Sequence, residues 1–179
     1  MKRFIEQAIL SEASDRGSMP EIFLDMDGVV ADFNHGAARA MDRKFGGRLD
    51  NNKITNDEWK IILATPDFWL TLPVLADGVR VYKYVKKYRL NVLSAAPDGD
   101  PTAEAQKKKW FLSKIGTVSG KINIVRRKDK IKFAVTNGTP NILIDDFNKN
   151  IKEWEAAGGI GILHTSAKKT LDALKELGF

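Results

Sequence analysis

Hydrophobic residues along the chain gather in short runs, separated by stretches in which apolar residues recur at helical spacing. Five runs are rich in Val, Ile or Leu and show little polar alternation: residues 22–24, 90–94, 122–125, 141–145 and 160–164. Such runs are typical of parallel strands that are covered on both faces. Helical spacing occurs in residues 79–88, 104–115, 148–157 and 167–177. The alternation predicts an α/β fold, a Rossmann-like three-layer sandwich with a central parallel sheet of about five strands.

The interval between the first two predicted strands is longer than one crossover helix requires. It contains helix-like residues 37–45, a polar break at 46–52, and further helix-like residues 57–64 and 66–70. We interpret it as a small helical cap inserted after the first strand. The predicted division is therefore an α/β core of residues 20–32 and 90–179, and a cap of residues 33–89.

Residues 1–19 precede the first predicted strand. Phe4, Ile5, Ala8 and Ile9 can form the apolar face of a short helix, and Ser, Asp, Gly and Pro residues follow it. We interpret this segment as an appendage to the domain. A helix packed on the edge of the domain is the alternative.

The amino-acid composition excludes several kinds of covalent and metal site. The 179 residues include no cysteine, which excludes disulfides and thiolate metal sites, and two histidines, His35 and His164, too few for a typical zinc site. The formal net charge of +6 favours anionic partners such as nucleotides or nucleic acid, although a solvated basic surface explains it equally well. No apolar run approaches the length of a membrane span, so no membrane partner is expected.

Acidic and hydroxyl side chains stand where the predicted strands end. Asp25 and Asp27 follow the first strand, Ser94 ends the second, and Asp145 and Asp146 end the fourth. A turn would explain the Asp-Gly pair at 27–28, but it leaves Asp25, directly after three apolar residues, unexplained. Ligands of open parallel sheets bind beyond the carboxyl ends of the strands. These side chains are therefore expected to share one site.

A metal-assisted phosphoryl-transfer site fits such a group. The reaction needs a positioned nucleophile, cations that spread the charge of the phosphoryl oxygens, and an acid for the leaving oxygen. A carboxylate can serve as the nucleophile. Mg²⁺ prefers oxygen ligands, which Asp25 and Asp145 could supply, and the ion would offset the repulsion between clustered carboxylates.

Four sequence motifs carry a resemblance to a known family. The segment DMDGVV at residues 25–30, Ser94, a downstream lysine, and ILIDD at residues 142–146 resemble the motifs of the haloacid-dehalogenase-like phosphatases. Within that superfamily the chain is most similar to the 5′(3′)-deoxyribonucleotidase group, through DMDGVVADF at 25–33, KKKW at 107–110 and the segment from residue 142 to residue 164. The resemblance covers residues 21–164.

The resemblance implies a role for each motif residue. Asp25 would be the nucleophile and a Mg²⁺ ligand, and Asp27 would be the general acid and base, with its backbone carbonyl on the metal. Ser94 would donate a hydrogen bond to a phosphoryl oxygen. Asp145 would bind Mg²⁺, with Asp146 near the ion or its waters. Two further residues would face the phosphate: Lys107, and the lysine of the third motif.

Two departures from the family pattern stand out. The second motif reads Ser94-Ala95-Ala96-Pro97 where the family usually has Thr-Ser or Thr-Ala. The third-motif lysine is Lys130 or Lys132, because the segment before Asp145 is lengthened, and we prefer Lys130.

Three aromatic residues of the predicted cap are candidates for contact with the substrate. Phe33, Phe68 and Trp69 could form an apolar slot for a base, or could simply pack the cap on the core.

Leu10-Ser11-Glu12-Ala13 resembles the end of targeting peptides of some large tailed bacteriophages, so a phage-encoded member acting in the host cytoplasm is one interpretation.

The sequence therefore predicts a cytoplasmic Mg²⁺-dependent phosphomonoesterase that acts through an aspartyl-phosphate, with a (deoxy)nucleoside monophosphate as the expected substrate. A nucleic-acid 3′-phosphatase using the same site is one alternative. A non-catalytic binding or structural protein on the same fold is another, and the complete set of acids argues against it. No oligomeric state follows from the sequence.

Overall fold

The computed structural model describes residues 19–42 and 54–179. Five parallel strands form its central sheet in the order β3-β2-β1-β6-β7. They are β1 (Ile22–Leu24), β2 (Leu90–Ala95), β3 (Ile122–Val125), β6 (Ile142–Asp145) and β7 (Ile160–Leu163). All five coincide with the predicted apolar runs within a residue or two. The predicted parallel sheet and Rossmann-like fold are confirmed.

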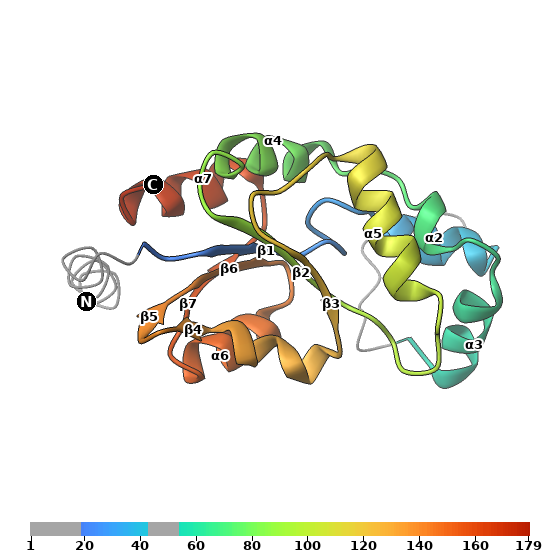
Figure 1. Ribbon diagram of the computed structural model, residues 1–179. Helices are drawn as coiled ribbons and strands as arrows, with labels where there is room; N and C mark the ends of the chain where they lie inside the picture. The colour runs from blue at the N-terminus through green and yellow to red at the C-terminus, as the bar shows by residue number, and fades with distance from the viewer. Residues whose placement is uncertain (1–18, 43–53) are drawn as a thin grey trace.

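Helices cover both faces of the sheet (Figure 1). On one face α4 (Ala76–Val85) packs against α7 (Ala167–Glu176), and on the other α6 (Asn148–Ala156) packs on β6 and β7. The 3-10 helix η3 (Arg127–Phe133) lies beside α6, and α5 (Ala103–Lys114) contacts β3. A short hairpin, β4 (Val135–Thr136) and β5 (Thr139–Pro140), precedes β6.

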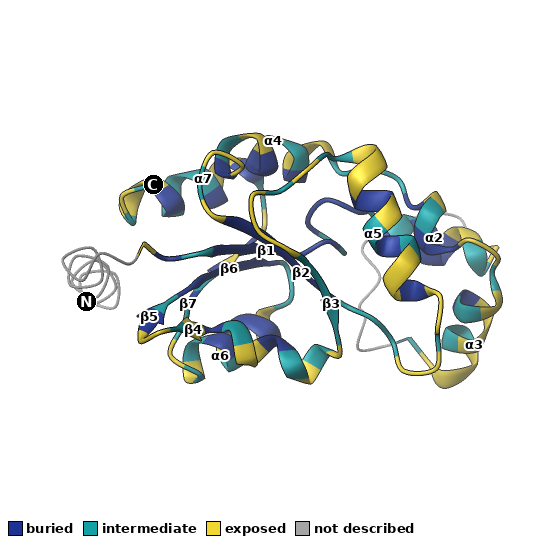
Figure 2. Cartoon of the chain, in the orientation of Figure 1, coloured by how far each residue is buried: buried dark blue, intermediate teal, exposed yellow. Residues whose placement is uncertain are grey.

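Alternation along the strands divides the core in two. Ile22 and Leu24 of β1 belong to the larger apolar cluster, with side chains of α4 and α5, whereas Phe23 between them packs with Trp154 of α6 in the smaller one. Successive strand residues point to opposite faces, so both faces of β1 are buried. Figure 2 shows this pattern as dark strands inside helices whose outer faces are exposed.

The predicted cap contains α2 (Phe33–Ala40), α3 (Asn56–Ala64) and the 3-10 helix η2 (Trp69–Thr71), which lie beyond the carboxyl ends of the strands (Figure 1). Residues 43–45 and the polar break at 46–52 fall outside the described residues, as do residues 1–18. The helix α4 lies within the predicted cap range, yet it packs against α7 on the core. The division at residues 33 and 89 stays a prediction.

Helix ends depart from the predicted ranges. The helix α2 begins at Phe33 rather than Ala37, because the Asp32 carboxylate accepts a hydrogen bond from the His35 amide and caps it. The helix α4 spans Ala76–Val85 rather than 79–88. Its early start brings Gly78 against the backbone of Val29, where a Cβ atom would lie 1.9 Å from the Val29 carbonyl oxygen. Within the described residues, no helix is both long and apolar enough to cross a membrane.

Candidate active site

The segment that follows β1 turns back at once. The amide of Asp25 donates to the carbonyl of Ile144 at 2.9 Å, which continues the sheet by one residue. The chain then loops, and Gly28 adopts a φ of +77°, a conformation that favours glycine. A Cβ atom at Gly28 would lie 2.1 Å from Oδ2 of Asp146. The glycine therefore allows the loop to approach the acidic pair at the end of β6.

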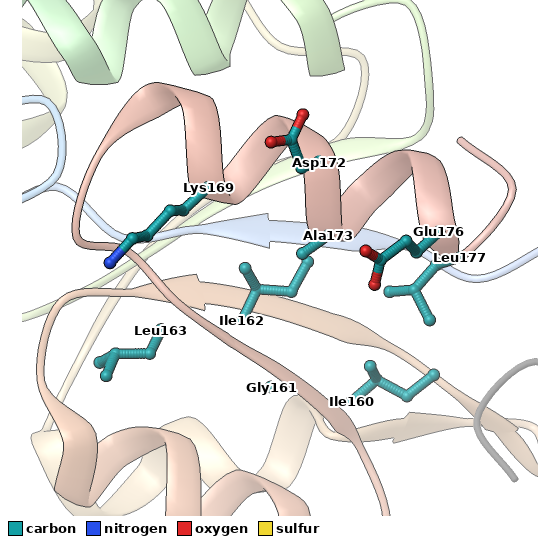
Figure 3. Close-up of a pocket in the computed structure, with 9 residues that line it drawn as sticks. All are labelled: Ile160, Gly161, Ile162, Leu163, Lys169, Asp172, Ala173, Glu176 and Leu177. Carbon is teal, nitrogen blue, oxygen red and sulfur yellow. The ribbon is translucent and has the colours of Figure 1, made fainter. Parts of the chain in front are cut away.

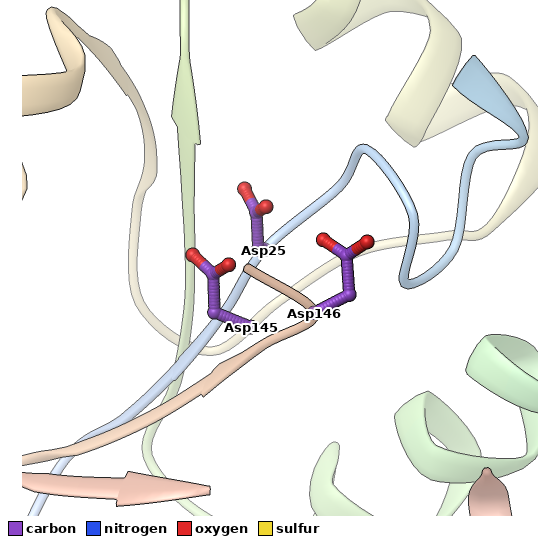
Figure 4. A group of neighbouring side chains, drawn as sticks. All are labelled: Asp25, Asp145 and Asp146. Carbon is purple, nitrogen blue, oxygen red and sulfur yellow. The ribbon is translucent and has the colours of Figure 1, made fainter. Parts of the chain in front are cut away.

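Three carboxylates meet at this edge of the sheet (Figure 4). Oxygen atoms of Asp25, Asp145 and Asp146 lie within 4.8 Å of one another. Asp25 and Asp145 are buried, with 5% and 0% of their surface exposed, and Asp146 is half-buried. Strand pairing explains the convergence, because β1 and β6 are neighbours in register and both end at this edge.

Lys130 of η3 is the cation between two of these carboxylates. Its Nζ atom lies 2.9 Å from Oδ1 of Asp25 and 2.8 Å from Oδ2 of Asp145, and only 3% of the residue is exposed. Burial works to lower the pKa of Lys130, but the adjacent Asp145 and Asp25 outweigh it and raise the pKa. Lys132, the other candidate for the third motif, is exposed and paired with Asp129 at 2.8 Å. Lys130 is therefore the lysine of this run that lies at the carboxylates.

The electrostatics of Asp25 reflect a crowded, buried site. Burial raises its pKa to about 8; Lys130 works in the opposite direction, and the neighbouring Asp145 and Asp27 add to the increase. The charged form of Asp25 is thus disfavoured until more positive charge is supplied.

Asp145 is fixed from the side of α6. Its Oδ1 atom accepts a hydrogen bond from the Phe147 amide at 2.8 Å, and its Oδ2 atom accepts one from Nδ2 of Asn150 at 2.9 Å. Arg127 in turn donates to Asn150 at 3.2 Å and pairs with Glu153 at 2.6 Å. These contacts hold the Asp145 carboxylate in one orientation.

A second buried lysine contacts Asp27. Lys107 of α5 is 1% exposed and donates to Oδ2 of Asp27 and, at 3.1 Å, to Oγ of Ser94. Its Nζ atom also lies 4.2 Å from the ring centroid of Trp69. Oδ1 of Asp27 is buried without a hydrogen-bond partner. Lys107 therefore fixes one oxygen of Asp27 and leaves the other available.

A cavity of about 300 Å³ opens over this group. Its lining combines charged residues, among them Asp25, Asp27 and Lys130, with aromatic side chains from the cap. The complete lining is Asp25, Asp27, Phe33, Trp59, Trp69, Ala95, Ala96, Pro97, Arg127, Lys130, Asp146, Phe147, Lys149 and Asn150. Four of the predicted phosphoryl-transfer residues, Asp25, Asp27, Lys130 and Asp146, thus share one cavity with an apolar surface, whereas Ser94, Lys107 and Asp145 are not among its lining residues.

The aromatic wall of the cavity is formed by Phe33, Trp59 and Trp69. The rings of Phe33 and Trp69 are stacked, with centroids 6.0 Å apart and planes inclined by 22°, and Trp59 of α3 lies 5.7 Å from Phe33. Phe68 stands edge-on to Trp69 with ring centroids 4.8 Å apart and is not among the lining residues.

A separate cavity of about 370 Å³ lies between β7 and α7 (Figure 3). Its lining includes Ile160, Ile162, Lys169 and Asp172. None of the clustered carboxylates contributes to it, so its larger volume does not make it the catalytic candidate.

Comparison with known proteins decides the family. The sequence profile of the family described as "5' nucleotidase, deoxy (Pyrimidine), cytosolic type C protein" matches residues 19–173. The chain belongs to this family. The predicted resemblance to haloacid-dehalogenase-like phosphatases of the deoxyribonucleotidase group is confirmed, and the chain is an enzyme of the 5′-nucleotidase type. Its phage origin and cytoplasmic location stay predictions. No curated protein matches the chain significantly.

Solved structures support the fold of the family. A HAD-superfamily hydrolase, subfamily IA, from Geobacter sulfurreducens PCA has a TM-score of 0.52 at 13% identity, covering 87% of this chain and 99% of that one. A putative beta-phosphoglucomutase from Bacteroides vulgatus has a TM-score of 0.52 at 12% identity, covering 98% of each chain. A hydrolase from Streptococcus pneumoniae TIGR4 has a TM-score of 0.50 at 11% identity, covering 87% and 97%. Identities this low show the fold alone.

The site's charges fit a divalent cation. The acidic side chains outnumber the buried ammonium groups by two, since four carboxylates (Asp25, Asp27, Asp145 and Asp146) face Lys107 and Lys130. Burial raises the pKa of Asp25, and the neighbouring carboxylates Asp145 and Asp27 add to the increase. Mg²⁺ prefers carboxylate oxygens, and three of these groups already converge. The residues present therefore suit the metal that the family implies.

The structure also brings residues to the site that the sequence did not single out. Trp59, Lys149 and Asn150 line the cavity, and Asn150 also holds Asp145. Asn150 follows Asp145 by five residues, which places it in the first turn of α6, and this spacing was a usable signal. The sequence around Trp59 has no feature that would separate a cavity-lining residue from an ordinary apolar residue of a short helix.

Proposed function

We propose that this protein is a Mg²⁺-dependent phosphomonoesterase that hydrolyses (deoxy)nucleoside monophosphates through a phosphoryl group carried on Asp25. One observation carries the proposal: the cavity lined by Asp25 and Lys130, which pairs with both Asp25 and Asp145, is also lined by aromatic side chains of the cap. A phosphate at the charged residues and a base at the aromatic rings would match these two kinds of surface. Aromatic rings bind bases by stacking with little dependence on the base.

In the first step, an Asp25 carboxylate oxygen attacks phosphorus and the ester P–O bond breaks. The carboxylic acid of Asp27 gives its proton to the leaving oxygen, so the product is a neutral nucleoside hydroxyl. In the second step, the Asp27 carboxylate takes a proton from water as the water oxygen attacks phosphorus. The bond to Asp25 breaks, which releases inorganic phosphate and restores both side chains.

The remaining site residues bind and orient. Lys130 would neutralise charge on Asp25 and on the transferring group. Lys107, which donates to Asp27 and Ser94, would orient Asp27, and Lys107 and Ser94 would stabilise phosphoryl oxygens. Asp25, Asp145, Asp146 and the backbone carbonyl of Asp27 would hold Mg²⁺, which supplies positive charge to the phosphoryl oxygens. Phe33 and Trp69, joined by Trp59 and backed by Phe68, would contact the base.

A phosphate-release screen tests the proposal. Nucleoside monophosphates, sugar phosphates and 3′-phosphorylated oligonucleotides are compared with Mg²⁺ and with excess chelator. We expect turnover on nucleoside monophosphates with Mg²⁺ and none with chelator. Preference for the oligonucleotide would replace this substrate assignment with a nucleic-acid end. No release from any substrate would contradict the proposed function itself.

A further inference from the structure

The loop between β2 and α5 contains Asp100, and residues of the same loop donate hydrogen bonds to one oxygen of its carboxylate. Oδ1 of Asp100 accepts hydrogen bonds from the Thr102 amide at 2.8 Å, the Thr102 hydroxyl at 2.7 Å and the Ala103 amide at 3.1 Å. These contacts fix the carboxylate at the first turn of α5. Asp100 belongs to none of the four motifs and does not line the catalytic cavity.

The other oxygen of this carboxylate reaches the cap. Oδ2 of Asp100 accepts a hydrogen bond from Nε1 of Trp69 at 2.7 Å. Burial works to raise the pKa of Asp100, but the hydrogen bonds from Trp69 and Thr102 outweigh it and lower the pKa, so the acceptor is a carboxylate. Hydrogen bonds to charged acceptors are stronger than neutral ones.

Trp69 depends on such contacts for its orientation. It belongs to a 3-10 helix of three residues that has no side-chain cap, so little in its own backbone fixes the ring. One contact of the indole is the stacked ring of Phe33 and another is Nζ of Lys107. The bond to Asp100 sets the direction of the indole N–H, and with it the tilt of the ring between these two neighbours.

We propose that Asp100 is a positioning residue, which holds the Trp69 indole in the wall of the cavity and thereby sets affinity for substrates that carry a base. This inference rests on the proposed function. Asp100 itself contacts Trp69 and not the acids, and the hydrogen bonds that Lys107 donates to Asp27 and Ser94 do not involve Asp100. Its removal therefore weakens binding of nucleotides and spares phosphoryl transfer from small esters.

The kinetic test uses Asp100→Asn, which keeps the shape of the side chain but removes its charge and leaves one acceptor oxygen for both Trp69 and the loop donors. We expect KM for a deoxynucleoside monophosphate to rise about tenfold or more, which corresponds to a lost hydrogen bond to a charged group, with kcat nearly unchanged. Turnover of a short alkyl phosphate should not change. Asp98→Asn is the matched control, since Asp98 lies in the same loop and forms an ion pair with exposed Arg126 at 3.2 Å. It should behave as wild type toward both substrates.

A double variant separates the bond from a general effect on the loop. In a Trp69→Phe background the N–H donor is absent, so adding Asp100→Asn should have no further effect on KM. An equal loss of activity on alkyl phosphate, or an undiminished effect of Asp100→Asn in the Trp69→Phe background, would overturn the proposal.

A spectroscopic readout works without any turnover, and so separates this proposal from the proposed function. With fluorotryptophan incorporated, the ¹⁹F resonance lost in Trp69→Phe is assigned to Trp69. Asp100→Asn should shift and broaden this resonance and leave those of Trp110 and Trp154 in place, whereas Asp98→Asn should leave all of them in place. An unmoved Trp69 resonance would contradict the positioning role, even if the enzyme hydrolyses nucleotides as proposed.

Discussion

Lys130 and Lys132 stand two residues apart in the same 3-10 helix and have opposite surroundings. Lys130 is buried between Asp25 and Asp145, whereas the Lys132 side chain is 71% exposed. Removing one partner from a buried ion pair leaves an uncompensated charge and typically costs about 3–5 kcal/mol. A surface pair contributes about 1 kcal/mol or less.

Lys130→Gln should therefore lower the free energy of unfolding by several times more than Lys132→Gln, and should abolish phosphate release while Lys132→Gln keeps it. Urea unfolding without metal and a phosphate assay measure the two effects. Equal losses in the two variants would show that the buried lysine has no special role.

Asp27 has a different task from Asp25 in the proposed reaction, and a substitution can separate them. Asp27→Asn keeps the side-chain shape and the backbone carbonyl, so substrate and metal should still bind. Without general acid and base help, turnover should fall about 10²–10⁴-fold. Steady-state kinetics alongside nucleotide-binding measurements test this, and a loss well below that range would mean that another group carries the proton.

At the scale of single residues, the sequence was most informative where an acidic side chain directly follows a predicted strand. A carboxylate directly after three buried strand residues, as in Asp25, has few structural explanations. The sequence supported only a slight preference for Lys130 over Lys132, because η3 has no regular apolar pattern to show which side is buried. The sequence indicated Trp69 as a possible base contact because it is aromatic, but its hydrogen-bond partner Asp100 lies 31 residues away in another loop. No local pattern connects the two.

At the scale of elements, the turn after β1 depends on one glycine. Gly28 has a φ of +77° and stands against the Asp146 carboxylate, whereas Gly138, in the β4–β5 turn, has a φ of +81° and open space around it. Alanine at either position adopts a left-handed conformation at a cost of roughly 1–2 kcal/mol. Only at position 28 does its methyl group also meet an acid of the proposed metal site.

Gly28→Ala should therefore require more Mg²⁺ for half-maximal activity, and Gly138→Ala should not, although both lose stability. Activity titrated with Mg²⁺, with thermal unfolding of both variants as the control, tests the comparison. If both variants show the wild-type Mg²⁺ requirement, the contact between Gly28 and Asp146 does not matter for metal binding.

Strands were predicted more accurately than helix ends. A buried parallel strand is a continuous apolar run, and its limits are visible in the sequence. The ends of α2 and α4 depend on the Asp32 cap and on the approach of Gly78 to Val29, and the second of these is a tertiary contact. The β4–β5 hairpin turns at Asn137 and Gly138, both with positive φ. That dipeptide is a strong hairpin signal, and its strands are only two residues long.

At the scale of the whole molecule, the described sheet is complete without residues 1–18. β1 begins at Ile22 and is paired on both sides, with β2 and β6. A chain that starts at Ser18 should therefore keep its melting temperature within a few degrees, and its phosphatase activity. Calorimetry and a phosphate assay on the shortened chain test this. Unfolding or loss of turnover would make the N-terminal segment an integral part of the domain.

The architecture as a whole brings the proposed chemistry together. β1 lies between β2 and β6, so the residues that follow these three strands meet at one edge, below the helices of the cap. Sequence alone indicated which residues stand at strand ends. The central position of β1 and the burial of Lys107 beneath Trp69 are properties of the assembled fold.

The most direct test of the account is phosphate release from a deoxynucleoside monophosphate with Mg²⁺, compared between the wild-type protein and Asp25→Asn. The substitution keeps the shape of the side chain, but it removes the attacking oxygen and one negative charge from the metal site. We expect turnover by the wild type and none by a folded Asp25→Asn protein, with circular dichroism confirming the fold. Substantial turnover by Asp25→Asn would contradict phosphoryl transfer to Asp25.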